Sequence, residues 1–344
     1  MNISNRSKQK LKTLSAVIIV SCLAAGIFNL ITVEIGPGPF AQGIIDGFFI
    51  SLLLGGYLIF MAQGYLTNLF RNLNFTTTLF INSAVLVFLF LCGRFIGIYV
   101  THHDVVLIIN GFFTGNFYYA LGLAFFLSVS INFVIQMNRL VGQNVLKNFI
   151  SGTYHKPKEE ERFFMFLDLE SSTRIAESLG NKKFHSLLSM FFYDVTDAVL
   201  ETDGEIYEYI GDEVVVSWKK AEALKGGNCL RCFFLIKAQI VQNSETYLRE
   251  FGLVPDFRAG LHGGTVVAGE LGDVRQKIGF VGDVLNSTAR IRDYCRDKNR
   301  RFLVSDRIID QIQIPEVFLV EDMGDFQPRG KQQSFKIYGV AEKP

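Results

Sequence analysis

The first half of the chain alternates between long apolar runs and short polar segments. Apolar runs cover about residues 14–33, 41–61 and 77–98, and a fourth begins near residue 107 or 117 and ends at 137. A helix of roughly 20 apolar residues crosses a hydrocarbon core about 30 Å thick. The pattern therefore predicts an all-α transmembrane bundle of four helices over residues 1–137.

Basic residues indicate how these spans are oriented. With four spans, the basic residues fall on one side of the membrane, and Glu34 and the turn at residues 101–104 fall on the other. Lys and Arg are in excess on the cytoplasmic side of membrane proteins. The pattern predicts an integral protein of the plasma (inner) membrane whose N-terminus and C-terminal half are cytoplasmic. The basic residues are Arg6, Lys8, Lys10, Lys12, Arg71, Arg139 and Lys147.

Residues 138–161 link the two halves as a predicted helix and loop. Apolar positions from Leu140 to Ile150 suit a helix that continues from the fourth span, and the polar segment SGTYHKPKEEE suits a loop. Such a helix could transmit motion between the halves or serve only as a spacer, and the sequence fits both interpretations.

From residue 162 onward, strand-like runs alternate with amphipathic helical segments. FFMFLDL predicts a strand, the apolar spacing from Phe184 to Val199 predicts a buried helix face, and GEIYEYIGDEVVVSW predicts a hairpin. An amphipathic segment at about 221–251, strands around FRAGLHGGTVVAGEL, a helix after Gly282 and a β-rich tail at 302–340 follow. This interleaving predicts an α+β domain over residues 162–344, with helices covering one face of a sheet.

Charge and cysteine content exclude several classes of protein. Lys and Arg total 34 and Asp and Glu total 33, so the net charge is +1 and no basic field suits nucleic acid. Two of the five cysteines lie in apolar runs, so a disulfide scaffold is not expected. Cys229 and Cys232 lack the second pair that a zinc ribbon requires, and a buried helix face explains both.

Two carboxylates follow strand-like runs in the C-terminal half. Asp168 ends FFMFLD, and Asp212 follows a glycine that lets a turn approach phosphate closely. Ser171, Ser172 and Thr173 open the next helix, whose N-terminal NH groups suit phosphate oxygens. Carboxylate oxygens suit magnesium, so these residues predict a site for two divalent ions and a polyphosphate. A helix cap at Asp168 and a turn at Asp212 explain the same residues without a ligand.

Asn286 and Arg290, in the segment FVGDVLNSTARI, favour the site with a ligand. Residues four apart project from one face of a helix. There the amide can position a ribose, and the guanidinium can stabilise charge on a phosphorus atom during transfer. The segment therefore favours phosphoryl-transfer chemistry over two isolated structural carboxylates.

Five segments, taken in order, resemble the successive motifs of the class III adenylate and guanylate cyclase catalytic domain. The resemblance covers about residues 162–340, and the membrane half has no comparably diagnostic motif. It implies a ferredoxin-like βα sandwich preceded by the transmembrane bundle. The segments are FLDLESST, GEIYEYIGDE, FRAGLHGGTVVAGELG, FVGDVLNSTARI and PRGKQQSFKIYGV.

The resemblance also implies a reaction and a homodimer. The ribose 3′-hydroxyl of ATP or GTP would attack the α-phosphate and give a 3′,5′-cyclic monophosphate and pyrophosphate. In this family the metal aspartates come from one subunit and the other groups from its partner, so two equivalent shared sites are expected. The implied residues are Asp168, Asp212 and the Leu169 carbonyl for two Mg²⁺ or Mn²⁺ ions, Asn286 for the ribose, Arg290 for the transition state and Lys331 for the terminal phosphates.

Two base-binding positions leave the choice of purine open. Adenylate cyclases of this family usually have a lysine where this chain has Glu208, and an aspartate or threonine where it has Gly279. A carboxylate accepts hydrogen bonds from guanine N1–H and N2–H, whereas adenine N1 is itself an acceptor, so Glu208 favours GTP. Against this, bacterial-type membrane cyclases mostly make cyclic AMP, and Gly279 selects nothing by itself.

Two other interpretations fit parts of the sequence. YIGDEVV resembles the GGDEF hairpin of diguanylate cyclases, but the tandem glycine and the phenylalanine are missing. A catalytically inactive cyclase-like domain could instead bind nucleotide or a partner and regulate. Inactive members usually lack a metal aspartate or the arginine, and this chain has both aspartates and Arg290. Formation of a cyclic product by the purified protein distinguishes these interpretations.

Overall fold

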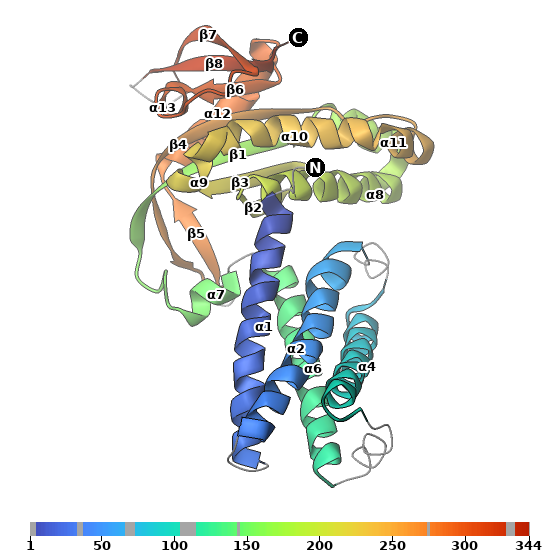
Figure 1. Cartoon of the computed structure of the whole chain (residues 1–344). Coiled ribbons are helices and arrows are strands. Elements are labelled where there is room, and N and C mark those ends of the chain that lie inside the picture. Colours follow the sequence, from blue (N-terminus) through green and yellow to red (C-terminus); the bar gives the residue numbers. More distant parts are fainter. Residues whose placement is uncertain are drawn as a thin grey trace. The chain divides into compact units, whose positions relative to one another are not determined.

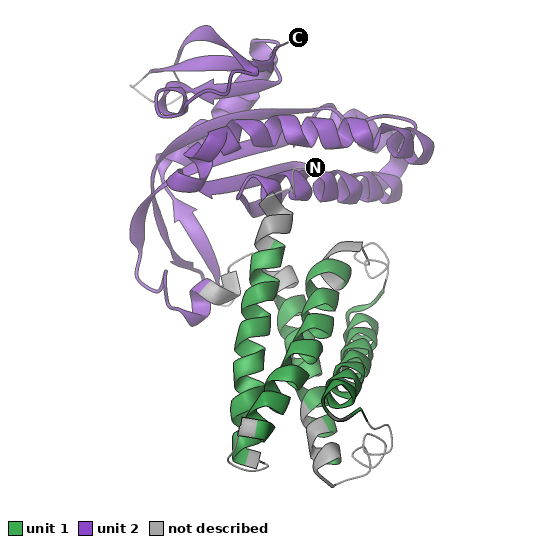
Figure 2. Cartoon of the chain, in the orientation of Figure 1, with its two compact units in different colours: residues 1–140 green, residues 141–344 purple. Residues whose placement is uncertain are grey.

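The chain folds into two compact units, residues 1–140 and residues 141–344 (Figure 1, Figure 2). The computed structural model describes residues 5–32, 37–65, 73–103, 115–142, 145–273, 276–327 and 334–343. All of the site residues predicted from the sequence belong to the second unit.

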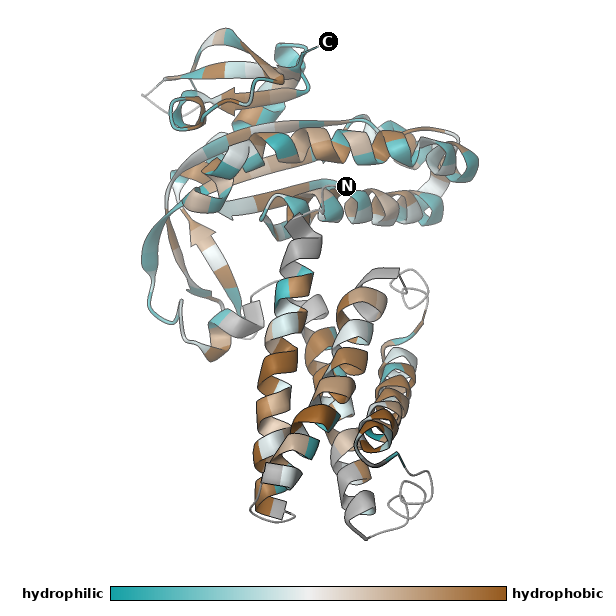
Figure 3. Ribbon diagram, viewed as in Figure 1, coloured by the Kyte–Doolittle hydropathy of each residue, from teal (hydrophilic) through white to brown (hydrophobic). Residues whose placement is uncertain are grey.

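Unit 1 consists of long apolar helices (Figure 3). They are α1 (Asn5–Thr32), α2 (Pro37–Gly56) with its π-helical continuation η1 (Tyr57–Tyr65), α4 (Phe75–His102) and α6 (Gly115–Val141). Among the described residues, three segments are long and apolar enough to cross a membrane, namely Lys10–Ile31, Gly38–Met61 and Phe75–Thr101. These agree with three of the predicted spans.

The fourth predicted span, about residues 117–137, lies in the helix α6 (Gly115–Val141). Its apolar stretch among the described residues is Ala124–Met137. The count of four spans therefore stays a prediction. The possible earlier start near residue 107 lies outside the described residues.

Glycines let the helices of unit 1 approach closely. A Cβ on Gly43 of α2 would collide with the backbone of Ala25 in α1, and a Cβ on Gly93 of α4 would lie 2.7 Å from the Cα of Ile50 in α2. Lipid tails are as apolar as the side chains, so membrane helices associate mainly through close packing of small residues. The glycine-rich second run is therefore explained by the contacts of α2 with both α1 and α4.

The linker helix is not continuous with α6. α6 ends at Val141, Gly142 has φ 105°, and the next helix, α7, covers only Val145–Ile150. A positive φ at the residue after a helix is typical of a glycine that terminates it. Turns follow α7, and the first strand begins at Lys158, inside the segment that the sequence predicts as a loop.

Unit 2 contains the predicted strands, hairpin and helices. The amphipathic segment at 221–251 is divided, because Gly226 and Gly227 adopt positive φ and Asn243 separates the last two helices. The elements are β1 (Lys158–Leu169), α8 (Ser172–Glu201), β2 (Glu205–Ile210), β3 (Glu213–Lys219), α9 (Lys220–Leu224), η2 (Lys225–Gly227), α10 (Asn228–Gln242), α11 (Ser244–Phe251), β4 (Phe257–Leu271), β5 (Lys277–Val281), α12 (Asp283–Asp297), β6 (Phe302–Ser305), α13 (Asp306–Ile309), β7 (Phe318–Phe326) and β8 (Phe335–Glu342).

The strands form one sheet in the order β2-β3-β1-β4-β6-β8-β7, and β5 pairs with β4 beside this path. The first part, β2-β3-β1-β4, is antiparallel throughout. With α8 after β1 and α9 to α11 after β3, it has the ferredoxin-like βαββαβ connectivity. The implied fold class is therefore confirmed. A parallel pairing of β4 with β6 extends the sheet by three strands.

Alternate residues of β1 face opposite sides of this sheet, as the period of two in a strand requires. Phe163, Met165 and Leu167 belong to the main apolar core, which includes residues of α8, α10 and α11. Phe164 and Phe166 belong to a smaller cluster with residues of α12 and β5. α12 thus adds a helix to the face that the sequence prediction left open.

Candidate active site

The two carboxylates predicted to bind metal lie at the ends of neighbouring strands. Asp168 is the penultimate residue of β1, and Asp212 lies in the two-residue loop that joins β2 to β3. Because the register places Asp168 opposite Glu213, the loop lies beside the end of β1. Gly211 begins the loop with φ 64°, a value that fits a type II′ hairpin turn. The hairpin sequence therefore brings both aspartates to one edge.

The electrostatics of this pair fit a divalent cation. The Asp168 and Asp212 carboxyl groups are close enough to share a hydrogen bond when one is protonated. Burial raises the pKa of Asp168, the positive charge of Arg292 opposes that rise, and the negative charge of Asp212 adds to it. A bound cation would relieve this repulsion between facing carboxylates.

The available ligand set is small. Within the described part of the chain, no group of three or more His, Cys, Asp or Glu side chains is arranged to hold a metal ion. The candidate protein ligands at this edge are two carboxylates and a main-chain carbonyl, such as that of Leu169. Mg²⁺ is commonly held by one or two carboxylates together with waters and substrate phosphates, so the residues fit this ion.

Sequence reasoning missed a cation beside these carboxylates. Arg292 of α12 lies with Nη1 2.9 Å from Asp168 Oδ2 and with Nη2 2.8 Å from Glu213 Oε2. Its Nε lies 3.2 Å from Asp293 Oδ1. Burial raises the pKa of Glu213 to about 7, although Arg292 opposes the rise. Glu213 directly follows Asp212, and Arg292 is two residues beyond Arg290. Only this proximity in sequence to predicted residues could have pointed to Glu213 and Arg292.

The predicted phosphate-binding turn opens α8. Ser171 is the N-cap residue, Ser172 begins the helix, and Thr173 is exposed. Ser171 has φ 57°, a left-handed conformation that costs free energy for a residue with a side chain. In the described structure no side chain caps this helix end. Its first NH groups therefore suit an anion, as the sequence predicts.

Asn286 and Arg290 lie together on the exposed face of α12. Successive residues of a helix are about 100° apart, so Asn286 and Arg290 differ by about 40°, whereas Arg292 is about 200° from Arg290. Arg292 contacts Asp168, and Arg290 therefore points away from the Asp168 of its own chain. Within one chain, α12 separates the predicted catalytic pair from the predicted metal pair.

A cavity of about 440 Å³ adjoins Arg290 and not the metal carboxylates. Neither Asp168 nor Asp212 lines it, which agrees with the separation across α12. Lys331, predicted to hold the terminal phosphates, lies in residues 328–333, outside the described residues. The lining residues are Arg290, Asp293, Tyr294, Asp297, Asp325, Phe326 and Gln327.

Glu208, the predicted base-binding acceptor, forms an ion pair. Lys277 Nζ on β5 lies 3.1 Å from Glu208 Oε1 and 3.3 Å from Glu208 Oε2 on β2. Both side chains are partly exposed. Gly279, two residues beyond Lys277, lies against the exposed Leu271 side chain, which would have to move to admit a Cβ there. Sequence reasoning treated Glu208 as a lone carboxylate and did not find Lys277.

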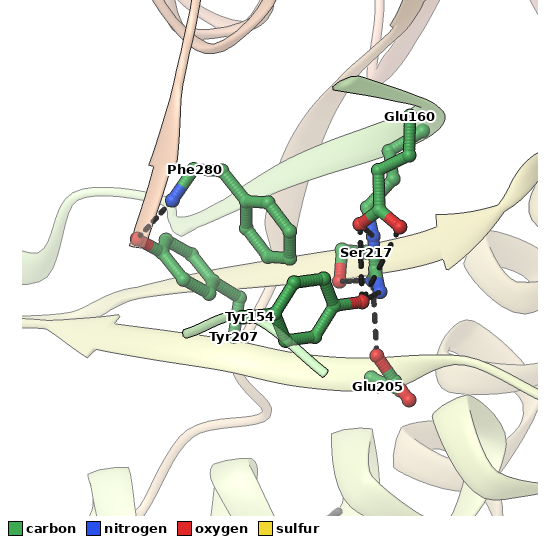
Figure 4. Close-up of polar contacts among 7 residues, drawn as sticks. Tyr154, Glu160, Glu205, Tyr207, Ser217 and Phe280 are labelled. Atoms are coloured by element: carbon green, nitrogen blue, oxygen red, sulfur yellow. Dashed lines mark hydrogen bonds and ion pairs between the residues drawn. The ribbon is translucent and has the colours of Figure 1, made fainter. Parts of the chain in front are cut away.

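A buried polar network holds the strands that carry this ion pair (Figure 4). The Phe280 amide of β5 donates to the Tyr207 hydroxyl of β2 at 3.3 Å. The buried Arg162 guanidinium stacks 4.4 Å from the centroid of the Phe280 ring and donates to Glu205 at 2.9 Å. Tyr207 is next to Glu208, and Phe280 is next to Gly279. The network therefore fixes the backbone beside each predicted base-binding position.

The CxxC motif has a structural role. Cys229 and Cys232 are both buried in α10 and belong to the main apolar core. Burial raises the pKa of Cys232 to about 12, so its thiol stays protonated near neutral pH. Neither cysteine is disulfide-bonded. The interpretation as a buried helix face is confirmed.

The fold of unit 2 and the order of its motifs are those of a class III cyclase catalytic domain. Residues 154–341 match the family model described as the adenylate and guanylate cyclase catalytic domain. This match covers more than half of the chain, and the chain belongs to that family.

Relatives and solved structures agree with this assignment. "Adenylate cyclase 2" of Rhizobium meliloti (strain 1021) is 36% identical over 210 residues, which are 61% of this chain and 58% of that protein. "Adenylate cyclase 1" of the same strain is 25% identical over 182 residues, which are 51% of this chain and 27% of that protein. A bacterial light-regulated adenylyl cyclase of known structure is similar with a TM-score of 0.55 at 18% identity, over 67% of each chain. That last similarity concerns the fold alone.

Proposed function

We propose that the protein is a membrane-anchored nucleotide cyclase that converts a purine nucleoside triphosphate into its 3′,5′-cyclic monophosphate and pyrophosphate. Membership of the cyclase family and similarity to two adenylate cyclases support this activity. The observation that carries the proposal is the separation of two half-sites. One side of α12 lies against the paired carboxylates, and the other side presents Asn286 and Arg290 to solvent.

In the proposed reaction, the ribose 3′ oxygen forms a bond to the α-phosphorus. The bond from that phosphorus to the oxygen bridging the α- and β-phosphates breaks, and the hydroxyl proton is released to solvent. The Asn286 amide holds the ribose so that the 3′ oxygen faces the α-phosphorus. The Arg290 guanidinium donates hydrogen bonds to the α-phosphate oxygens as negative charge develops on them.

The remaining predicted residues hold the polyphosphate and its cations. Bound to the carboxylate pair, two Mg²⁺ or Mn²⁺ ions would lower the pKa of the attacking hydroxyl and neutralise the phosphates. The NH groups at the start of α8 and the ammonium of Lys331 would bind phosphate oxygens until pyrophosphate leaves. The residues proposed for these roles are Asp168, Leu169, Asp212, Ser171, Ser172, Thr173 and Lys331.

The direction of the side chains supports a homodimer. Arg290 points away from the Asp168 of its own chain, yet the reaction requires an arginine and the metal carboxylates at one phosphate. A second copy, related by two-fold symmetry, can supply Arg290 and Asn286 to the carboxylates of the first. The same operation completes a second, equivalent site.

The ion pair between Glu208 and Lys277 weakens the argument for GTP. As a lone acceptor Glu208 favours guanine, but Lys277 adds a donor and balances its charge. The pair can accept from adenine N6–H and donate to adenine N1, or accept from guanine N1–H and donate to guanine O6. Since the two relatives described above are named adenylate cyclases, we propose ATP as the principal substrate.

The membrane context is part of the proposal. Three described helices of unit 1 are long and apolar enough to anchor the protein in a membrane. With α6 as the fourth span, the distribution of basic residues supports a plasma-membrane protein whose N-terminus and catalytic domain are cytoplasmic, where ATP and GTP are available.

A product assay tests the proposed function. The full chain, purified in detergent or lipid nanodiscs, is incubated with ATP or GTP and with Mg²⁺ or Mn²⁺, and the cyclic product is quantified. We expect cyclic AMP to exceed cyclic GMP, with an Asp212→Asn variant as the inactive control. If cyclic GMP predominates, GTP and not ATP is the principal substrate. No cyclic product from either nucleotide would instead support an inactive, regulatory cyclase-like domain.

A further inference from the structure

Arg292 occupies the place where a cation is proposed to bind. Its guanidinium is within 2.9 Å of Asp168 Oδ2 and within 2.8 Å of Glu213 Oε2, so ion pairs link α12 to both β1 and β3. The Arg292 side chain is 18% exposed and that of Glu213 is 10% exposed. An ion pair in this environment is weakly screened by solvent, and the guanidinium lies between two carboxylates of neighbouring strands.

The backbone of Arg292 is fixed as firmly as its side chain. A Cβ on Gly260 of β4 would lie 2.8 Å from the Cα of Arg292, so only glycine lets α12 approach the sheet this closely. Ile291 and Cys295, on either side of Arg292 in the helix, are buried. The position of the guanidinium at the end of β1 is therefore determined by packing, unlike that of a surface arginine with many available rotamers.

We propose that Arg292 is a resident counter-ion of the metal site, which neutralises Asp168 in the nucleotide-free protein and weakens the binding of free divalent cations there. This inference rests on the proposed function, because it takes Asp168 and Asp212 as metal ligands. A positive charge beside Asp168 opposes a divalent cation on the same carboxylate. Metal binding would then be tight only when the cation arrives with a nucleotide, whose phosphates supply further ligands and negative charge.

Arg292 has a defined position after the cation binds. Asp168 would turn one oxygen to the metal, while Arg292 keeps its contacts with Glu213 and Asp293. Arg292 is thus a positioning residue, since it acts on the reaction through Asp168 and contacts no substrate atom. The arrangement would limit occupation of the site by metal alone and couple metal binding to substrate binding.

The test measures metal binding without catalysis. Mn²⁺ is titrated into the purified full chain in the absence of nucleotide, and free Mn²⁺ is measured by electron paramagnetic resonance. We expect Arg292→Gln to bind Mn²⁺ about tenfold more tightly than the unmodified protein, because one like charge is removed from beside the cation. Arg296→Gln makes the same charge change at an exposed position of the same helix and should stay within about twofold, because solvent and salt screen a distant exposed charge.

Two further variants keep the outcomes distinguishable. Glu213→Gln combined with Arg292→Gln keeps the net charge and does not leave the buried Glu213 carboxylate unpaired, so it serves if the single variant does not fold. It should still bind Mn²⁺ more tightly than the unmodified protein, because Asp168 is released. Equal or weaker binding in the folded Arg292 variants would overturn the inference. If Asp168→Asn binds Mn²⁺ as well as the unmodified protein, the proposed metal site itself is wrong.

Discussion

The two faces of the unit 2 sheet differ in what they bury. The face covered by α8, α10 and α11 is largely apolar and includes the stacked rings of Phe233 and Phe302, whose centroids are 4.4 Å apart. The face against α12 and β5 combines a small apolar cluster with buried or half-buried Arg162, Glu213 and Arg292. Apolar burial stabilises a fold directly, whereas buried charges must be paired to be tolerated.

This difference suggests a division of roles between the two faces. We expect the apolar face to supply most of the free energy of folding. The charged face places ionic groups where they cost stability, as proteins often do at functional sites. Substitutions on the apolar face should therefore change stability and leave the chemistry unaltered, and substitutions on the exposed side of α12 should do the reverse.

The largest expected effect is on activity at α12. Arg290→Ala should lower the rate of cyclic product formation by about a thousandfold, because the developing charge on the phosphate loses its guanidinium. The melting temperature should not change, since Arg290 is exposed. Arg296→Ala, at an exposed position further along the same helix, is the matched control and should keep near-normal activity. Equal losses in both variants would contradict a specific role for Arg290.

A core substitution should have the opposite signature. Leu230→Ala on α10 removes a fully buried side chain from the apolar face. The free energy of unfolding, measured by chemical denaturation of the solubilised protein, should fall by about 3 kcal/mol. At low temperature, where the variant is still folded, its turnover should match the unmodified protein. A large loss of turnover in fully folded protein would contradict the proposed division of roles between the two faces of the sheet.

One buried carboxylate is an exception on the apolar side. Asp194 of α8 accepts hydrogen bonds from the Tyr247 hydroxyl at 2.7 Å and from the Asn243 amide at 2.8 Å. Tyr247→Phe should cost about 1 to 2 kcal/mol at neutral pH, because the buried carboxylate loses a donor. Tyr209→Phe removes a partly exposed hydroxyl and is the matched control.

The cost of Tyr247→Phe should depend on pH. Burial raises the pKa of Asp194, and the Tyr247 and Asn243 hydrogen bonds oppose that rise. A bond that holds down the pKa of an acid stabilises the fold above that pKa and loses this effect as the pH falls through it. The stability difference between Tyr247→Phe and the unmodified protein should therefore shrink in acid. A difference that grows as the pH falls would contradict this assignment.

The smallest expected effect concerns the choice of purine. Lys277→Ala leaves Glu208 as a lone acceptor, which favours guanine N1–H and N2–H. The ratio of kcat/KM for ATP to that for GTP should fall by about fivefold, with little change in stability because Lys277 is half exposed. Lys237→Ala, at an exposed position on α10, is the control. An unchanged ratio would show that the ion pair between Lys277 and Glu208 does not select the purine base.

Local patterns explain what could be predicted from the sequence. The hairpin around Gly211, the strand that ends near Asp168 and the helix that carries Asn286 and Arg290 are all set by residue spacing. The ferredoxin-like order followed from the family resemblance, because strand pairing between distant segments has no local signal. Three of the four apolar spans predicted from the sequence are met by described helices, and the fourth stays a prediction.

The contacts that the sequence did not predict join distant elements. Arg292 meets Asp168 only because α12 packs closely on β4 at Gly260. Lys277 meets Glu208 only because side chains of β2 reach β5, which pairs with β4, as the hydrogen bond from the Phe280 amide to the Tyr207 hydroxyl also shows. In the sequence each of these residues is an ordinary charged side chain. Their effect depends on three-dimensional proximity, which composition and periodicity do not encode.

The central claim is that each active site is shared between two copies of the chain. Asp168→Asn and Asn286→Ala, each expected to be inactive alone, are co-expressed with different affinity tags, and heterodimers are isolated by sequential purification. One of the two sites in each heterodimer then carries neither substitution, so about half of the unmodified activity per dimer should return. Verified heterodimers without activity, alongside active unmodified dimers prepared in the same way, would show that the site is not built across two copies.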